Sequence, residues 1–180
     1  MKKLILLFTI FFILSCKDSI QLKDYGKVEN FTLVNQDNQK IEFYSLKGKP
    51  ILLFFGYTHC PDYCPITLSK LTKIYKKLPE EQKPYIVLIT VDPERDTPDV
   101  LKNYIKKFDG EIIALTGSTE EIQEIAKKLG VYIRIEKKMD HIHVEHNTST
   151  FFLDKDFKIR YIFSFREPEE TYFKVFNSYF

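Results

Sequence analysis

The sequence is poor in the features that mark several protein classes. Three cysteines are too few for a disulfide-rich scaffold, and six glycines and eight prolines in 180 residues exclude a collagen-like or low-complexity chain. The sequence also has no large excess of positive charge, because its 27 basic residues are nearly balanced by 25 acidic ones. This balance excludes a general nucleic-acid binder. Phe and Tyr supply 27 residues, so the chain is not intrinsically disordered. We expect one sizeable globular core.

The N-terminal hydrophobic run is too short for a membrane-spanning helix, which needs about 20 apolar residues. It covers Leu4–Leu14, is apolar except for Thr9, and follows Lys2 and Lys3. This pattern is typical of a secretory signal peptide. The Ile-Leu-Ser-Cys that ends it resembles a bacterial lipobox, which implies that Cys16 is diacylated and becomes the mature N-terminus. An ordinary signal peptide with an incidental cysteine is the alternative.

Cleavage before Cys16 changes the charge of the chain. It removes two lysines and no acid, so 25 basic residues face 25 acidic ones and the mature net charge is zero. We expect a protein of the bacterial cell envelope, anchored to a membrane by its lipid and facing outside the cytoplasm, in the periplasm. Residues 1–15 are then the signal peptide, 16–29 a polar tether and 30–178 a single domain. Disulfides persist in that compartment.

Apolar patterns along the domain alternate between strand and helix. Continuous apolar runs at Ile51–Phe55 and Tyr85–Val91 predict strands buried on both faces. A helical period predicts helices over 64–78, 97–108, 118–129 and 167–176, with caps at Thr97-Pro98 and Ser118/Thr119 and a stop at Gly130. We therefore predict an α/β arrangement: a central, mostly parallel sheet flanked by helices. An added N-terminal β-hairpin is expected over 31–43, a short strand over 112–115 and a late hairpin over 150–163.

Cys60 and Cys64 lie between the first buried strand and the helix that follows it. A helix N-terminus favours a thiolate and lowers the pKa of a cysteine there. Two thiols at this spacing could close a disulfide or hold one metal ion. Because closing so short a loop adds little stability, redox or metal chemistry is favoured over a structural disulfide or two inert buried thiols.

Three of the four histidines, His141, His143 and His146, precede the late strand. No proline lies between Asp99 and Glu167, where a thioredoxin-type oxidoreductase would have its cis-proline. Soft thiolates with an imidazole select Cu(I), and Zn(II) is the nearest rival. Two Cys and one His make a three-coordinate site that suits Cu(I), whereas zinc would need a fourth ligand. A surface or core histidine is the alternative.

Three ordered motifs resemble the SCO/SenC family of the thioredoxin-like superfamily, copper-handling proteins of cytochrome c oxidase assembly. They are GYTHCPDYCP at Gly56–Pro65, VDPERDTP at Val91–Pro98 and VEH at Val144–His146. The resemblance covers about residues 28–178. It implies a thioredoxin-like fold with extra elements and copper binding by Cys60, Cys64 and His146, as Cu(I) and with Cu(II) left open.

Other polar residues near these motifs have two interpretations each. Asp92 and Asp96 could orient the site or contact a partner, or they could serve as turn and cap residues. Glu145 stands where the family usually has Asp, and a longer carboxylate can still hydrogen-bond nearby. His141 and His143 are either solvated loop residues or auxiliary copper ligands.

Two functions are consistent with these residues. The first is a copper metallochaperone, not an enzyme, that receives Cu(I) from an upstream donor and delivers it by ligand exchange to the binuclear copper site of a cytochrome c oxidase subunit. The second is a thiol–disulfide oxidoreductase in which Cys60 attacks a partner's disulfide and Cys64 resolves it. Either function implies a thiol reductant. A peroxide-reducing or redox-sensing relative rests only on fold analogy.

Overall fold

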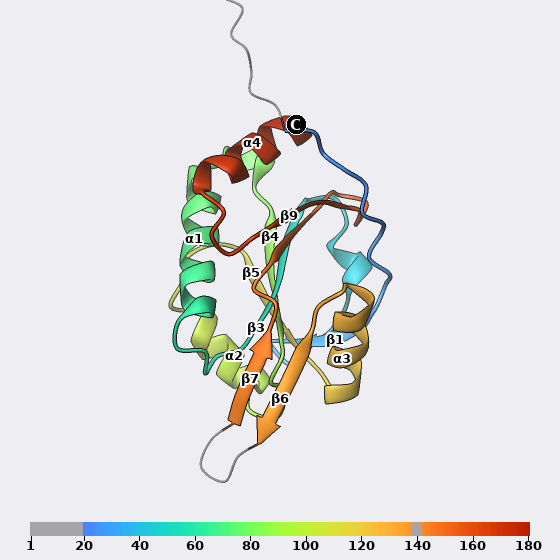
Figure 1. The fold of residues 1–180 in the computed structure, drawn as a ribbon, viewed down its shortest axis with the longest axis vertical. Helices are drawn as coiled ribbons and strands as arrows, with labels where there is room; N and C mark the ends of the chain where they lie inside the picture. The colour runs from blue at the N-terminus through green and yellow to red at the C-terminus, as the bar shows by residue number, and fades with distance from the viewer. Residues whose placement is uncertain (1–19, 138–141) are drawn as a thin grey trace, which may run out of the picture.

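The computed structural model describes residues 20–137 and 142–180. A seven-stranded sheet in the order β2-β1-β5-β4-β3-β8-β9 forms the middle of the domain (Figure 1). In this part of the chain no helix is long and apolar enough to cross a membrane. The strands of the sheet are β1 Thr32–Asn35, β2 Lys40–Glu42, β3 Ile51–Gly56, β4 Tyr85–Thr90, β5 Ile112–Thr116, β8 Thr150–Leu153 and β9 Ile159–Phe163.

The sheet is parallel at its centre and antiparallel at both edges. β3 pairs with β4 and β4 with β5 in parallel, as expected for strands separated by helices. β8 and β9 continue the sheet beyond β3 in antiparallel orientation. The predicted N-terminal hairpin is confirmed as β1–β2, and β1 joins it to β5. The chain therefore has the mixed α/β architecture that the alternating pattern predicts.

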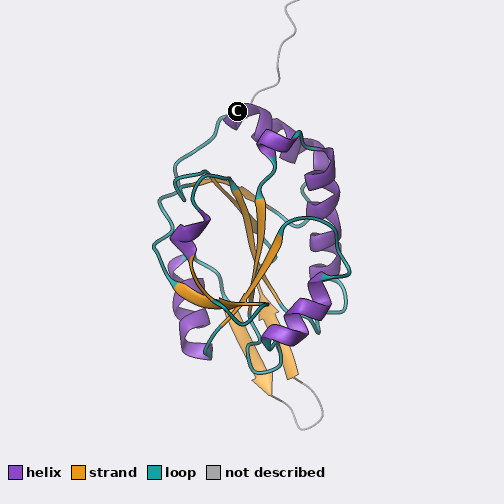
Figure 2. Ribbon diagram, turned by 180° about the vertical axis from the view of Figure 1, so that it is seen from behind, coloured by secondary structure: helices purple, strands orange, loops and turns teal. Residues whose placement is uncertain are grey.

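Helices cover both faces of this sheet (Figure 2). α1 (Tyr63–Lys77), α2 (Pro98–Ile105) and α4 (Glu169–Tyr179) pack on one face, and α3 (Thr119–Lys128) with a 3₁₀ turn at Phe43–Leu46 packs on the other. A second 3₁₀ turn covers Glu80–Gln82. Successive side chains of β3 alternate between these layers, and all are buried. The unbroken apolar run of β3 thus reflects burial on both faces.

The helix boundaries follow the capping residues of the sequence. The side chain of Thr97 accepts a hydrogen bond from the Val100 amide, with Pro98 at the first helical position. Ser118 and Glu121 form a reciprocal capping box at the start of α3. Gly130 follows α3 with a φ of +66°, which favours glycine. The predicted starts of α2 and α3 and the predicted stop are confirmed.

A separate two-stranded sheet projects from one end of the domain (Figure 1). It consists of β6 (Ile133–Lys137) and β7 (Ile142–His146) in antiparallel pairing. The patterns above predict no strand there. The hairpin follows α3 and leads into β8, so His146 stands at its last position.

Part of the segment expected as a tether runs along β9. The amides of Lys23, Tyr25 and Val28 donate to backbone carbonyls of Arg160, Ile159 and Phe157 at 3.2, 3.0 and 2.9 Å. Val28 is buried in the α3-side core. Residues 23–28 are therefore fastened to the edge of the main sheet.

Candidate metal centre

The topology brings the cysteines and His146 to the same end of the sheet. Cys60 lies in the loop after β3, and Cys64 lies in the first turn of α1. Since β8 runs antiparallel to β3, with Thr150 opposite Phe54, the segment before β8 returns to the carboxyl end of β3. A groove forms there, and a smaller cavity beside it is lined by Cys64 and His146. The groove is lined by Tyr57, Cys60, Pro61, Asp62, Tyr63, Val144, Glu145, His146 and Thr148.

The two cysteines are free thiols, and both are buried. The Cys64 amide donates to the sulfur of Cys60, with 3.4 Å between N and Sγ. The Cys64 sulfur lies against Gly56 at the end of β3, because a Cβ built at Gly56 would be 3.0 Å from it. The missing side chain of Gly56 therefore leaves the space that this sulfur occupies.

The two thiols have opposite acidities. A hydrogen bond from the Cys64 thiol, reinforced by backbone amides at the start of α1, lowers the pKa of Cys60 to about 5 despite its burial. That same hydrogen bond and burial raise the pKa of Cys64 above its ordinary value. The pKa of Cys60 is lowered in the predicted direction, but the Cys64 thiol is the largest cause and the helix amides contribute less. The pair thus consists of one thiolate and one thiol.

Asp96 fixes the loop that carries Cys60. Its fully buried carboxylate accepts hydrogen bonds from the Thr58 amide (3.0 Å), the Thr58 hydroxyl (2.5 Å) and the Thr90 hydroxyl (2.7 Å). Thr58 stands two residues before Cys60. Of its two interpretations, the geometry therefore supports the orienting role for Asp96.

Asp92 has a more local role in the same turn. Its carboxylate forms an ion pair with Arg95, and its carbonyl accepts from the Asp96 amide at 2.9 Å. Its own amide donates to the Thr90 hydroxyl at 3.0 Å. These contacts match the turn interpretation, and through Thr90 they support the position of Asp96.

His146 faces the groove as a neutral imidazole. Its Nδ1 lies 2.7 Å from the Asn147 carbonyl, and since a carbonyl can only accept, Nδ1 carries the proton and Nε2 keeps a lone pair. Burial lowers the pKa of His146, while the Asn147 carbonyl opposes this shift. The ring stands edge-on to Tyr57, with 6.0 Å between centroids. His146 is therefore available as a ligand without losing a proton.

Cys60 and His146 line the groove and Cys64 lines the cavity beside it, but the three predicted donors do not form a closed coordination sphere. Within residues 20–137 and 142–180, no three His, Cys, Asp or Glu side chains are close enough to hold a metal ion. Glu145 is exposed and lines the same groove. His143 lies on β7 opposite Glu136, with a side chain outside the described part. His141 and Cys16 lie outside the described residues.

The sequence model of SCO1/SenC matches residues 21–180. The chain belongs to the SCO1/SenC family. An SCO2-like protein of Rickettsia typhi is 38% identical over 141 residues, which are 76% of this chain and 70% of that protein. The resemblance carried by the three motifs is thereby confirmed.

Solved structures of SCO proteins share the fold. ScoI of Bradyrhizobium japonicum, solved with copper bound, is 32% identical, with a TM-score of 0.77 over 86% of this chain and 100% of that one. A SCO1/SenC lipoprotein of Bacillus anthracis is 29% identical, with a TM-score of 0.73 over 84% and 93%. BsSco, a Sco-family cytochrome c oxidase assembly protein with a disulfide switch, is 30% identical, with a TM-score of 0.70 over 88% and 97%.

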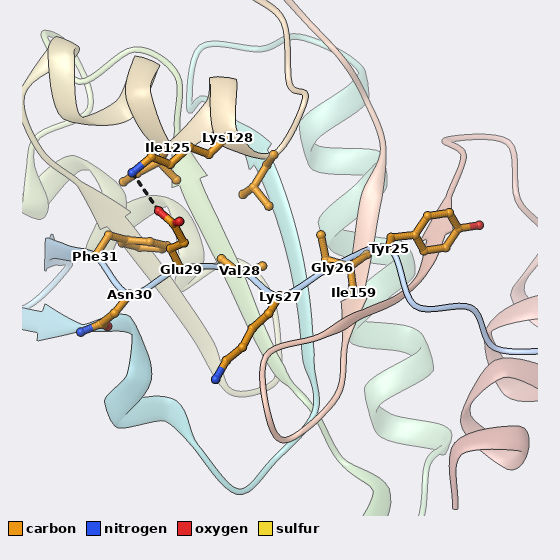
Figure 3. Close-up of a pocket in the computed structure, with 11 residues that line it drawn as sticks. Tyr25, Gly26, Lys27, Val28, Glu29, Asn30, Phe31, Ile125, Lys128 and Ile159 are labelled. Carbon is orange, nitrogen blue, oxygen red and sulfur yellow. Dashed lines mark ion pairs between the residues drawn. The ribbon is translucent and has the colours of Figure 1, made fainter.

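A second pocket is lined by none of Cys60, Cys64 and His146 (Figure 3). It is formed by the segment Tyr25–Phe31, by Ile125, Lys128 and Leu129 on and after α3, and by Ile159. An ion pair of 3.1 Å joins Lys128 to Glu29 across it. None of the predicted site residues lines this pocket, so it is separate from the candidate metal centre.

Some residues that shape the site were not singled out from the sequence. Thr58 and Thr90 share the carboxylate of Asp96, and Gly56 accommodates the Cys64 sulfur. One signal was available: Thr90 is a hydroxyl within the apolar run Tyr85–Val91, where a buried polar group needs a partner. That signal does not identify the partner, Asp96, which lies six residues later in the loop after β4.

Proposed function

We propose that this protein carries copper as cargo on Cys60, Cys64 and His146 and delivers it to the binuclear copper site of a cytochrome c oxidase subunit. The observation that carries the proposal is the shared groove, which a thiolate, a thiol and a neutral imidazole all line or adjoin. The copper-bound ScoI relative supports copper as the cargo, and BsSco supports the role in oxidase assembly.

The donor set fits Cu(I) chemically. Thiolates and imidazole are soft to intermediate ligands, and three of them satisfy Cu(I). Cys60 is already deprotonated and His146 presents a free Nε2, so loading requires only the proton of Cys64 to leave. Binding must also draw His146 towards the sulfurs. Copper binding would thus bring His146 and the two sulfurs together around the ion.

An open fourth coordination position favours transfer over storage. An incoming thiolate or imidazole of the acceptor can add to three-coordinate Cu(I) before a donor ligand leaves. Both sulfurs are buried, so the acceptor's ligand must approach through the groove between Tyr57, Tyr63 and His146. Transfer then proceeds by exchange of ligands, and no covalent bond of the acceptor is broken.

The test is an anaerobic Cu(I) titration of the reduced domain from Lys17 onward against a competing chelator. We expect one tightly bound copper per chain, and in His146→Ala an affinity at least tenfold lower, about 1.4 kcal/mol. His59→Ala is the matched control, because it removes a half-exposed imidazole beside Cys60 that does not line the groove. This control should bind copper as the parent does.

Two results would contradict the chaperone. One is a parent protein that binds no copper tightly, and the other is a His146→Ala variant that retains and transfers copper normally. A Cys64→Ser variant shows that copper loss can be told apart from misfolding. It should lose copper binding and keep the circular dichroism spectrum of the parent.

The opposite acidities of Cys60 and Cys64 favour a second candidate, a thiol–disulfide oxidoreductase. The Cys60 thiolate would attack a partner's disulfide and release one partner thiolate. Cys64, after losing its proton, would attack the Cys60 sulfur and release the second partner thiol, leaving a Cys60–Cys64 disulfide. BsSco supports redox chemistry in a relative. Reduction of oxidised acceptor peptide by His146→Ala at the parent rate would favour this candidate, because the exchange needs no imidazole.

We also propose that Cys16 carries the lipid that anchors the domain outside the cytoplasm. The hydrophobic run followed by Ser15 and Cys16 supports this, as does the naming of the Bacillus anthracis relative as a lipoprotein. Intact mass of the protein extracted from membranes is the test. A Cys16→Ala variant should lose both the lipid mass and the membrane fraction.

A further inference from the structure

The chain reaches the domain at the end opposite the copper site. The amide of Ile20 donates to the Ser178 hydroxyl of α4 at 2.9 Å. Ile20 and Leu22 pack on the core cluster under α4. In Figure 1 the first described residues start beside the C-terminal end of α4, and the β6–β7 hairpin projects at the other end of the long axis.

The α1 helix sets the scale of this separation. Cys64 is in its first turn, whereas Lys77 in its last turn forms an ion pair of 3.0 Å with Glu169 at the start of α4. Fifteen helical residues rise by about 22 Å. The sulfurs thus lie about one helix length below the layer of α4 to which Ile20 is bound.

The attachment between Cys16 and Ile20 is short. Four residue steps reach at most about 14 Å when fully extended. Residues beyond Ile20 add no slack, because Lys23, Tyr25 and Val28 are hydrogen-bonded along β9. A lipid on Cys16 would therefore keep the α4 end of the domain close to the bilayer.

The surface at this end suits a lipid headgroup region. Phe180 is 55% exposed and its ring packs edge-on against Tyr179, with 4.9 Å between centroids. Tyrosine is enriched at membrane–water interfaces because its ring has an apolar body and a polar hydroxyl, and Tyr179 is such a residue. Asn177 and Lys23 are exposed near the same end of the chain trace.

We propose that the short attachment holds the end formed by Ile20, Leu22 and the second half of α4 against the phospholipid surface, so that the Cys60–Cys64–His146 groove faces away from the anchoring membrane. This rests on the lipid anchor proposed above. The acceptor that fits is a protein whose copper ligands stand about a domain length above the same bilayer.

The test measures the height of two surface positions above the bilayer. The lipidated full chain, with Cys60→Ser and Cys64→Ser, receives one fluorophore through either Asn177→Cys near the α4 end or Tyr132→Cys near the groove. Each is reconstituted in phosphatidylcholine vesicles that contain a lipid with a nitroxide on its headgroup. Both positions are exposed, so the fold should tolerate the label.

We expect quenching at position 177 to exceed that at position 132 by about threefold or more, because the two differ by roughly the length of α1. A long Gly/Ser linker inserted before Ile20 should abolish the difference. Equal or reversed quenching with the lipid present, or a difference that survives the linker, would overturn the inference. A mass spectrum without lipid on Cys16 would overturn it together with the anchor. None of these readouts depends on copper, so the copper proposal is tested separately.

Discussion

The cysteine half and the histidine half of the site are built in different ways. Cys60 and Cys64 follow the central strand β3, and the loop between them is held by the buried Asp96. His146 ends a two-stranded sheet that, among the described strands, pairs only with itself. One half thus belongs to the main sheet, and the other lies on a separate hairpin that packs on the core through Val144, Ile133 and Ile135.

This difference suits the proposed copper chaperone, which has to both hold and release a metal. A fixed pair of sulfurs keeps the thiolate chemistry constant, since its hydrogen bonds come from rigid elements. His146 is the donor that has to move when the site closes, because the three donors form no closed group in the described part of the chain. The contrast leads to four predictions, each of which changes one half and leaves the other intact.

Removing the Asp96 carboxylate, which holds the loop of the cysteine half, has the largest expected effect on the free energy of unfolding. Asp96→Ala leaves the Thr58 amide and the hydroxyls of Thr58 and Thr90 without their acceptor inside the protein. We expect a loss of about 3 kcal/mol in the free energy of unfolding, measured by urea denaturation. Asp62→Ala is the control, because it removes an exposed carboxylate from the same loop and should cost less than about 0.5 kcal/mol. Equal losses of unfolding free energy in both variants would mean that the Asp96 carboxylate does not hold the loop in place.

Filling the space beside the Cys64 sulfur with a methyl group at position 56 has the second largest expected effect on stability. In Gly56→Ala the new Cβ meets the Cys64 sulfur at 3.0 Å, a Phe54 ring carbon at 3.1 Å and Leu88 Cδ1 at 3.2 Å. All three neighbours are buried, so we expect overpacking to lower the free energy of unfolding by about 1 to 3 kcal/mol. The same urea titration measures it. An unchanged midpoint would show that the core around Cys64 yields more easily than its packing suggests.

The acidity of Cys60 gives the third prediction. Its folded pKa of about 5 lies below the ordinary 9.0, so its thiolate forms as the pH rises through 5. Alkylation by iodoacetamide should therefore rise around pH 5 and then level off, whereas an ordinary thiol would continue to gain reactivity up to about pH 9. Mass spectrometry of each peptide against pH measures this.

The Cys64 thiol is the main cause of that shift and provides the control. In Cys64→Ala the hydrogen bond to the Cys60 sulfur is lost, so the midpoint for Cys60 should move to higher pH. A midpoint that stays near 5 would assign the shift to the helix N-terminus alone.

The smallest expected effect concerns the histidine half. His146→Ala removes a half-buried ring on the appended hairpin, so the free energy of unfolding should change by less than about 1 kcal/mol, although copper affinity falls. Thermal unfolding of the copper-free domain measures it. A loss as large as that of Asp96→Ala would show that the His146 ring contributes to the core that Val144 of the same strand joins.

The cysteine half could be predicted from sequence in more detail than the histidine half. Local signals were sufficient for β3, α1 and the capping residues Thr97 and Ser118, because buried runs and caps act over a few residues. Both strands of the β6–β7 hairpin alternate apolar and polar residues, over Ile133–Glu136 and over Ile142–Glu145, so a local signal was present that the sequence prediction missed; no glycine marks the turn. The partnership of Asp96 with Thr58 joins loops 38 residues apart, and no local pattern specifies such a contact.

The fastening of the N-terminal segment to β9 has a mechanical consequence. Lys27 faces Lys158 in antiparallel pairing, and the amides of Lys23, Tyr25 and Val28 all donate to the β9 strand or its turn. A pull transmitted through Ile20 runs along this segment, so it strains these hydrogen bonds together in shear instead of opening them one after another. Force from a moving bilayer would then be borne by the edge of the sheet. The sulfurs, two strands away beyond β8, would keep their geometry while the anchor is dragged.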